Sequence, residues 1–235
     1  NSPVIEVAKK REIKIFNLLV NNNEPSGKFS LTSKEEKISS SVNQNENIIP
    51  EDIALILHTS GTTSKPKMVP LTHLNLCTSA KNIVQTLNLN RSDKCINIMP
   101  LFHIHGIVGL LLSSLFSGGN IFTSSGFNAL KFFSWLKVFS PTWYSAVPTM
   151  HQAILSRANR NSEIIAQTNL RFVRSSSAPL PSTTMQEVEK TFHCPVIESY
   201  GMTEASHQMT SNHLPPGNRK AKKAGFAAGD QKSVV

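Results

Sequence analysis

From Pro50 onward, short apolar runs rich in β-branched residues alternate with longer amphipathic segments. This alternation favours an α/β fold with a doubly wound, mostly parallel sheet and helices on both faces. In such sheets, ligands bind in the loops beyond the carboxyl ends of the strands. The expected strands are 53–58, 95–99, 120–123, 142–147, 170–174 and 196–198, and the expected helices are 72–87, 105–116, 129–139, 148–158 and 181–192.

Composition divides the chain into three parts. Residues 1–49 are interpreted as a partial N-terminal segment, with one buried strand in IKIFNLLV, followed by a polar linker. Residues 50–216 form the predicted core domain. Residues 217–235 form a basic, solvated tail, because the last 17 residues hold five of the 24 Lys and Arg. The start lacks Met and a secretory signal, so we expect the middle of a longer protein.

Charge and cysteine content restrict the classes of function. The formal charge of +9 would suit nucleic acid, but no aromatic residues interleave with the cations, which disfavours that partner. Cys77, Cys95 and Cys194 are odd in number and far apart, which disfavours a disulfide framework and favours a reducing compartment. No apolar run reaches the length of a membrane span. We expect a cytoplasmic protein, with a peroxisomal parent as the alternative.

The segment HTSGTTSKPK, residues 58–67, follows the apolar run IALIL directly. Its small residues offer backbone N–H groups and hydroxyls in a compact turn, and Lys65 and Lys67 add positive charge. Such a turn suits the anionic oxygens of a phosphate. The spacing of a Walker loop is absent, and on composition alone a surface turn is the other interpretation.

Two further motifs follow in the chain, MPLFHIHG at 99–106 and ESYGMTEASH at 198–207. In this order, the three motifs resemble those of the adenylate-forming (acyl-activating) enzymes, and the resemblance extends from about Pro50 to about Pro216. Within that superfamily the sequence is most similar to oxalate–CoA ligases, with coumarate–CoA ligase-like proteins next. The resemblance implies that a carboxylate attacks the α-phosphate of ATP, giving an acyl-adenylate and pyrophosphate, and that the thiol of CoA then displaces AMP.

The same resemblance implies individual roles. Lys67, Thr203 and Glu204 would be catalytic, with Thr203 on the α-phosphate and Glu204 as the Mg²⁺ ligand. Residues 175–179 would form the wall between the adenine and the acid, and Tyr200 would pack on the adenine. The implied ATP-binding residues are Thr59, Ser60, Gly61, Thr62, Thr63, Ser64, Lys67, Ala178, Tyr200, Gly201 and Thr203.

The acid site would be polar. His103, Ser177 and His207 would converge there, and such donors favour a small dicarboxylate such as oxalate over an apolar tail. A His207 that caps a helix or faces solvent is the other interpretation. Zinc at His103 and His105 is disfavoured, because an i, i+2 pair in an extended segment points to opposite faces. We expect His105 to begin the following helix.

The sequence also departs from the family pattern. Met68 stands where the family usually has glycine after the loop lysine, and a side chain there would crowd the loop. The C-terminal domain that brings the catalytic lysine is not recognisable. The string GFAAGD, ending at Asp230, is similar to the family's ribose-binding motif but lies too close to the core. We therefore expect a fragment of an ATP-dependent carboxylic acid–CoA ligase. The alternatives are a coumarate- or fatty-acid-type ligase and a truncated, inactive nucleotide-binding module.

Overall fold

The computed structural model describes residues 3–21, 23–24, 27–33, 47–59 and 66–229. The chain forms two compact units, 1–48 and 49–235, which are described separately below. Several predicted site residues lie outside the described part of the chain, namely Ser60, Gly61, Thr62, Thr63, Ser64 and the tail residue Asp230.

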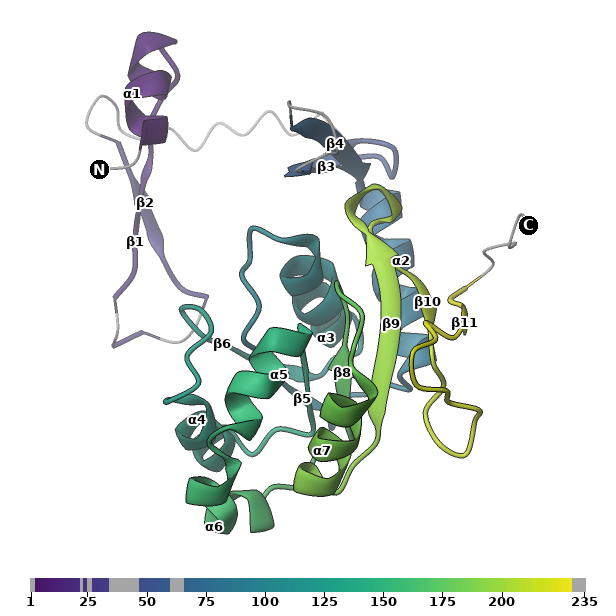
Figure 1. The fold of residues 1–235 in the computed structure, drawn as a ribbon. Coiled ribbons are helices and arrows are strands. Elements are labelled where there is room, and N and C mark those ends of the chain that lie inside the picture. The colour runs from purple at the N-terminus through teal and green to yellow at the C-terminus, as the bar shows by residue number, and fades with distance from the viewer. Residues whose placement is uncertain (1–2, 22, 25–26, 34–46, 60–65, 230–235) are drawn as a thin grey trace. The chain divides into compact units, whose positions relative to one another are not determined.

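The first unit holds one helix and a two-stranded ribbon (purple in Figure 1). Helix α1 spans Pro3–Lys10, and strands β1 (Asn17–Leu19) and β2 (Ser30–Thr32) pair antiparallel. All six strand residues are exposed, so the expected buried strand in IKIFNLLV was wrong. A lone two-stranded ribbon has no second layer to bury either of its faces.

The second unit is built on a seven-stranded sheet with the order β11-β10-β9-β8-β7-β5-β6 (Figure 1). The five strands β9, β8, β7, β5 and β6 run parallel, whereas at the other edge β10 pairs antiparallel with β9 and β11 pairs antiparallel with β10. This arrangement confirms the α/β prediction. The strands are β5 (Lys94–Asn97), β6 (Asn120–Thr123), β7 (Trp143–Ala146), β8 (Phe172–Ser175), β9 (Val196–Met202), β10 (His207–Ser211) and β11 (Phe226–Ala227).

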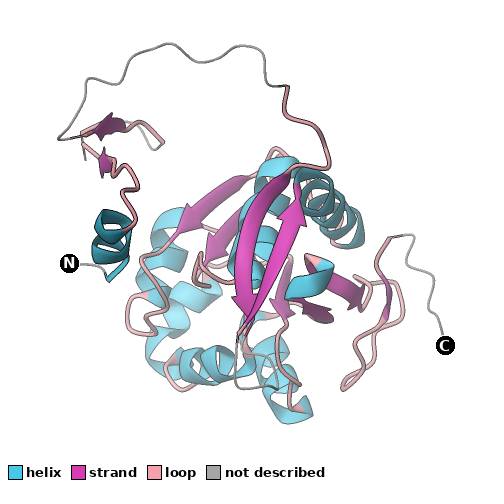
Figure 2. Cartoon of the chain, turned by 90° about the horizontal axis from the view of Figure 1, so that it is seen from above, coloured by secondary structure: helices cyan, strands magenta, loops and turns pink. Residues whose placement is uncertain are grey.

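Helices cover both faces of this sheet because successive buried apolar residues of its central strands point to opposite faces. Tyr144 and Val173 pack in one apolar cluster with α4, α5 and α7, whereas Trp143 and Phe172 pack in the other with α2 and η1. Figure 1 shows α7 and α2 on either side of β9, and Figure 2 separates helices from strands by colour. The helices are α2 (His73–Thr86), the π-helix η1 (His105–Leu112), α3 (Ser113–Phe116), α4 (Phe132–Phe139), α5 (Pro148–Leu155), the 3₁₀ helix η2 (Ala158–Asn161), α6 (Ser162–Ala166) and α7 (Ser182–Phe192).

Strand β3 (Ile53–Thr59) does not join the parallel sheet, which corrects the prediction for 53–58. It pairs antiparallel with β4 (Lys67–Thr72), so HTSGTTSKPK connects the two strands of a hairpin. The expectation that this motif follows a parallel strand was therefore wrong. The sequence KMVPLT was not recognised as a strand, although its Val69 and Leu71 are buried at a two-residue spacing.

An ion pair joins the loops at the amino ends of the parallel strands. Arg171 donates from Nε to Oδ1 of Asp93 at 2.8 Å and from Nη2 to Oδ2 at 2.9 Å. Thr142 Oγ1 donates to Oδ1 of Asp93 at 2.7 Å, and the backbone N–H of Asn90 donates to Oδ2 at 3.0 Å. Four hydrogen bonds thus satisfy a carboxylate that is only 3% exposed.

Most residues of the basic tail in 217–229 are exposed, but its backbone also makes specific contacts with the sheet. Strand β11 pairs with β10, and Asn212 donates from Nδ2 to the carbonyls of Lys220 at 3.2 Å and Lys223 at 2.8 Å. The lysine side chains of this segment are exposed, as expected from its charge. The tail therefore completes the antiparallel edge of the sheet.

Candidate functional site

A cavity of about 610 Å³ opens at the carboxyl ends of β8 and β9. Its volume lies in the range typical of small-molecule sites. It contains six of the predicted residues, which the fold brings together from two strand ends: Ser175, Ser177, Ala178, Pro179, Tyr200 and Gly201. The lining comprises Ser175, Ser177, Ala178, Pro179, Leu180, Pro181, Glu198, Ser199, Tyr200, Gly201, Lys222, Lys223 and Ala224.

The walls of this cavity offer both an aromatic surface and unsatisfied hydroxyls. Tyr200 is 53% exposed although it lies in β9, so its ring is available to a ligand. The buried hydroxyls of Ser175 and Ser199 have no hydrogen-bond partner within the described chain. Buried polar groups in native proteins are nearly always paired, so these two oxygens indicate a missing polar partner.

Gly201 keeps the edge of the cavity in place. It lies opposite Gln208 in the β9–β10 pair, and a Cβ at this position would lie 1.4 Å from the carbonyl oxygen of His207. No residue with a side chain allows that approach of the two backbones. The predicted match at Gly201 therefore has a clear structural reason, next to Tyr200.

The predicted phosphate and metal residues lie beyond the end of β9. Thr203 and Glu204 belong to the 3₁₀ helix η3 (Thr203–Ala205), with Thr203 half-buried and Glu204 exposed. Strand β4, which begins at Lys67, contacts η3, so the hairpin that carries the loop lysine lies against the motif that carries Thr203. Thr59 ends β3 with its hydroxyl buried and without a partner in the described residues.

Beside the cavity lies a buried polar cluster centred on His105. Its Nδ1 lies 3.0 Å from Oγ of Ser177, and its Nε2 lies 2.7 Å from Oγ of Ser145. Its ring stacks on that of His207, with centroids 4.9 Å apart. Gly109 permits this packing, because a Cβ there would lie 2.7 Å from Nε2 of His207.

Arg174 supplies the only charge in this cluster among the described residues. Its guanidinium is fully buried and donates from Nη2 to Nε2 of His207 at 3.0 Å and to Oε1 of Gln208 at 2.8 Å. Nη1 donates to Oγ of Ser145 at 3.5 Å, and Nε has no partner. No described carboxylate forms an ion pair with Arg174. Burial lowers the pKa of Arg174 to about 9, so the group stays charged at pH 7.

The histidines of the cluster are neutral at the same pH. Burial, and next the charge of Arg174, lowers the pKa of both His105 and His207 well below 6.5. Burial also lowers the pKa of His103. The cluster therefore combines one cation with two neutral imidazoles, which is an electrostatic environment suited to an anion.

The structure brings two of the three predicted acid-site residues together, whereas the third lies apart from them. Ser177 and His207 both contact His105, so these two are brought together as expected. His103 instead accepts a hydrogen bond at Nδ1 from the backbone N–H of His105 at 3.2 Å, and its side chain is exposed. His105 does begin η1 as predicted, but its side chain reaches the cluster.

Sequence reasoning missed Ser145, Arg174 and Gln208, and it gave His105 no role in the site. One signal was available, since Arg174 interrupts the buried strand FVRS of β8. A charged residue inside such a strand is expensive to bury without a function or a partner. The contacts of Ser145 and Gln208 link distant segments and leave no local pattern.

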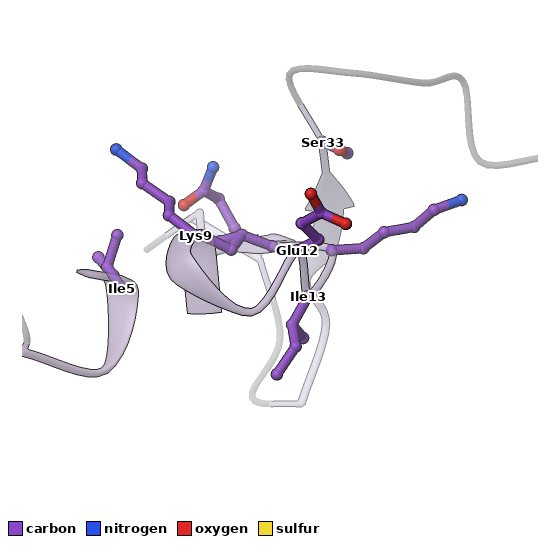
Figure 3. Close-up of a pocket in the computed structure, with 8 residues that line it drawn as sticks. Ile5, Lys9, Glu12, Ile13 and Ser33 are labelled. Carbon is purple, nitrogen blue, oxygen red and sulfur yellow. The ribbon is translucent and has the colours of Figure 1, made fainter. Parts of the chain in front are cut away.

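A second cavity, of about 480 Å³, belongs to the first unit (Figure 3). Its walls include Ile5, Lys9, Glu12, Ile13 and Ser33, and Figure 3 shows Glu12 and Ile13 pointing in opposite directions. Within the described residues, no three His, Cys, Asp or Glu side chains gather as a metal site, and no helix is both long and apolar enough to cross a membrane.

The family model of AMP-binding enzymes matches residues 2–235. The chain belongs to the AMP-binding enzyme family. An oxalate–CoA ligase of Saccharomyces cerevisiae is 47% identical over 169 residues, covering 72% of this chain and 30% of the relative. An oxalate–CoA ligase of Arabidopsis thaliana is 45% identical over 189 residues, covering 79% and 37%. This AMP-binding chain thus spans about a third of the length of the curated relatives it matches.

Solved structures of the family share the fold. A malonyl-CoA ligase, in a ternary product complex with methylmalonyl-CoA and AMP, superposes with a TM-score of 0.68 at 30% identity over 76% of this chain and 38% of that chain. ATP-bound MatB from Rhodopseudomonas palustris gives a TM-score of 0.68 at 30% identity over 76% and 34%. The predicted resemblance to adenylate-forming enzymes is confirmed.

Proposed function

We propose that this chain is the nucleotide- and acid-binding part of an ATP-dependent carboxylic acid–CoA ligase. One observation carries the proposal: hydrogen bonds through Ser177, His105 and Ser145 connect the cavity bordered by Tyr200 to a buried cation, Arg174, that has no carboxylate partner in the described chain. An aromatic surface suits an adenine, and a buried cation suits a carboxylate. The reaction of the parent joins these two ligands at the α-phosphate.

The residues present fit a nucleotide. The cavity has room for a small molecule, Tyr200 offers an exposed ring, and Ser175 and Ser199 offer unpaired hydroxyls. In this proposal Thr203 contacts the α-phosphate, and Lys67, together with Thr59 and the loop that follows it, holds the β- and γ-phosphates. Lysine suits this role because it supplies positive charge without a fixed geometry.

Mg²⁺ fits Glu204 in the way that proteins usually hold this ion. Protein-bound Mg²⁺ commonly takes one or two carboxylates and completes its coordination with water and substrate phosphates. Glu204 is an exposed carboxylate in η3 beside Thr203, and in this proposal it supplies the single protein ligand. When bound, the ion would neutralise phosphate charge while the acid attacks the α-phosphate and pyrophosphate leaves.

We propose a small dicarboxylate, oxalate, as the acid. The support is the polar composition of the cluster, in which Ser177 and His207 both contact His105. An apolar chain would supply no negative charge to balance the buried Arg174 guanidinium, which is unfavourable. A coumarate- or fatty-acid-type substrate is therefore the weaker candidate. The oxalate–CoA ligases named above agree with this choice.

Calorimetric titration of Mg·ATP into the full chain tests the proposal. Binding is expected in the wild type, and Lys67→Ala is expected to weaken it by about 10-fold or more, since a charge-assisted contact to phosphate is lost. Lys81→Ala removes an exposed lysine of α2 and serves as the matched control. If the wild type does not bind ATP, the proposal is contradicted, and the chain is an inactive module related to nucleotide-binding enzymes.

We further propose a cytosolic location, with the peroxisome as the alternative for the parent protein. The support is that Cys77, Cys95 and Cys194 are all free. Unpaired cysteines are typical of reducing compartments. Fractionation of cells that express a tagged full-length parent would test this location.

A further inference from the structure

A continuous line of hydrogen bonds runs from Arg174 to the cavity wall. It passes from the guanidinium to Oγ of Ser145 at 3.5 Å, from Ser145 to Nε2 of His105 at 2.7 Å, and from Nδ1 of His105 to Oγ of Ser177 at 3.0 Å. Its first three members are buried, and Ser177 is an exposed residue that lines the cavity. The line therefore connects a buried charge to a hydroxyl within reach of a ligand.

The chemistry of the partners sets the direction of these bonds. A guanidinium can only donate hydrogen bonds, so Arg174 donates one to Oγ of Ser145, and the hydroxyl hydrogen of Ser145 needs another acceptor. The structure offers Nε2 of His105 as that acceptor, at 2.7 Å. If Nε2 carried the proton instead, the buried hydroxyl hydrogen of Ser145 would lose this partner, which is unfavourable.

The remaining bonds follow from the same reasoning. A neutral imidazole that accepts at Nε2 carries its proton on Nδ1, so His105 donates to Oγ of Ser177. Oγ of Ser177 then accepts a hydrogen bond from His105, and its own hydroxyl hydrogen is free to donate to a ligand in the cavity. Arg174 sets the tautomer of His207 in the same way, because it donates to Nε2 of that ring at 3.0 Å.

We propose that Arg174, Ser145 and His105 form a positioning relay that turns the hydroxyl hydrogen of Ser177 into the cavity, where it donates to a carboxylate oxygen of the acid substrate. This inference rests on the proposed function, because it assigns the acid-binding donor of that site. Hydrogen bonds in a connected chain polarise one another, so the buried charge strengthens the donor. The relay thereby favours an ionised carboxylate over a neutral carbonyl group.

The backbone supports this role for Ser177. Its φ angle is 72°, in the left-handed region that residues with a β-carbon rarely adopt. Such a conformation persists only where the surrounding structure holds it, and it is common at ligand sites. The bond from His105 at 3.0 Å is one of the interactions that fix the serine there.

The tautomers give a test that needs no substrate. Two-bond proton–nitrogen NMR spectra of the ¹⁵N-histidine-labelled chain at pH 7.5 should show His105 and His207 neutral, with the proton on Nδ1. His105→Gln and His207→Gln identify the two signals. Ser145→Ala should remove the preference of His105 for the tautomer with its proton on Nδ1 and should leave the tautomer of His207 unchanged. A purely structural role of Ser145 would not produce this difference. A His105 ring protonated at Nε2 in the wild type would overturn the relay.

Oxalate binding gives the second test. Calorimetry with the AMP-saturated chain should show that Ser145→Ala and Ser177→Ala each weaken oxalate binding about 10-fold, as expected for one bond to a charged group. The double variant should be no weaker than Ser177→Ala alone, because both changes remove the same donor. Ser134→Ala, an exposed serine of α4, is the matched control.

The outcomes separate the two proposals. Additive losses in the double variant, or an unaffected Ser145→Ala, would overturn the relay while the proposed function stands. A wild-type chain that binds AMP but not oxalate would overturn the relay and the choice of acid together. Thermal unfolding of each variant, followed by circular dichroism, establishes that the compared chains are folded.

Discussion

Nη2 of Arg174 donates to Nε2 of His207 at 3.0 Å, and both side chains are buried. A buried cation is unfavourable unless an anion compensates it, and no described carboxylate does so here. The arrangement leaves the free protein with an unbalanced positive charge that hydrogen bonds through Ser145 and His105 connect to Ser177 at the cavity wall. An anionic ligand would restore that balance, so the pair links the stability of the site to its proposed occupant.

Replacement of Arg174 should therefore weaken acid binding selectively. Arg174→Met is expected to reduce oxalate affinity by about 100-fold, since one buried charge–charge interaction and the relay are both lost. AMP affinity should change by less than about 3-fold, because Tyr200 and the unpaired serines are untouched. Calorimetry with each ligand measures both values. Equal losses for AMP and oxalate would instead indicate general damage to the fold.

The contact between Gly201 and His207 predicts a large loss of stability. In Gly201→Ala, the new methyl group would meet the carbonyl oxygen of His207, so β9 and β10 must separate. We expect the free energy of unfolding to fall by more than about 3 kcal/mol, the range of severe single changes. Urea denaturation measures this quantity.

Gly118→Ala is the control for that experiment. Gly118 has a positive φ, at 73°, which Gly201 does not, and a Cβ at position 118 would meet only Cβ of Arg91, at 3.8 Å. Backbone strain alone should cost about 1 kcal/mol. A loss at Gly201 no larger than the loss at Gly118 would contradict a steric role for the backbone contact with His207.

The four hydrogen bonds to Asp93 predict a second stability effect. Asp93→Ala leaves Arg171 and Thr142 without their buried partner, so the free energy of unfolding should fall by about 3 kcal/mol. The exposed pair of Lys28 with Glu24 is the matched control, and Glu24→Ala should change stability by less than about 1 kcal/mol. A loss at Asp93 no larger than at Glu24 would contradict this account.

Three buried histidines predict that acid destabilises the second unit. Burial lowers the pKa of His151 to about 4 and lowers those of His105 and His207 well below 6.5. Above pH 6.5 the folded and unfolded chains both hold these imidazoles neutral, so pH has little effect through them. Below 6.5 the unfolded chain binds protons that the folded chain does not, so stability falls as pH falls.

The expected slope is about 1.4 kcal/mol per pH unit for each histidine, or about 4 kcal/mol per unit for all three. For His151 the loss should extend from pH 6.5 to about 4. Urea denaturation at pH 7.0, 6.0 and 5.5 measures the slope, and His151→Gln should reduce it by about a third. A stability that stays constant over this interval would contradict burial of the neutral rings.

The fold was largely predictable because each parallel strand is a short apolar run that can be recognised from the local sequence. Pairs such as Trp143 with Tyr144 are apolar on both faces, as a sheet covered on both sides requires. The hairpin strand β4 escaped prediction because its sequence KMVPLT contains Pro70, which usually argues against a strand. Pro70 is tolerated because β4 lies at the edge of a two-stranded sheet.

The site was less predictable than the fold. Motif resemblance found Tyr200, Gly201 and Ser177, which the structure places at one cavity. It gave His105 no role in the acid site and missed Arg174, because their partners lie in other elements of the chain. The distance in sequence from His105 to Ser177 is 72 residues, and only the order of strands in the sheet brings them together. Long-range contacts of this kind leave no periodic pattern.

The most direct test of the account is an NMR titration of the full ¹⁵N-labelled chain, first with AMP and then with oxalate. We predict that AMP shifts the backbone signals of Ala178, Tyr200 and Gly201, and that oxalate then shifts Ser177 and the imidazole of His105. Signals of the exposed helix α6 should stay unchanged in both steps. Shifts that avoid these residues, or no shifts with either ligand, would contradict the claim that this cavity joins a nucleotide to an acid.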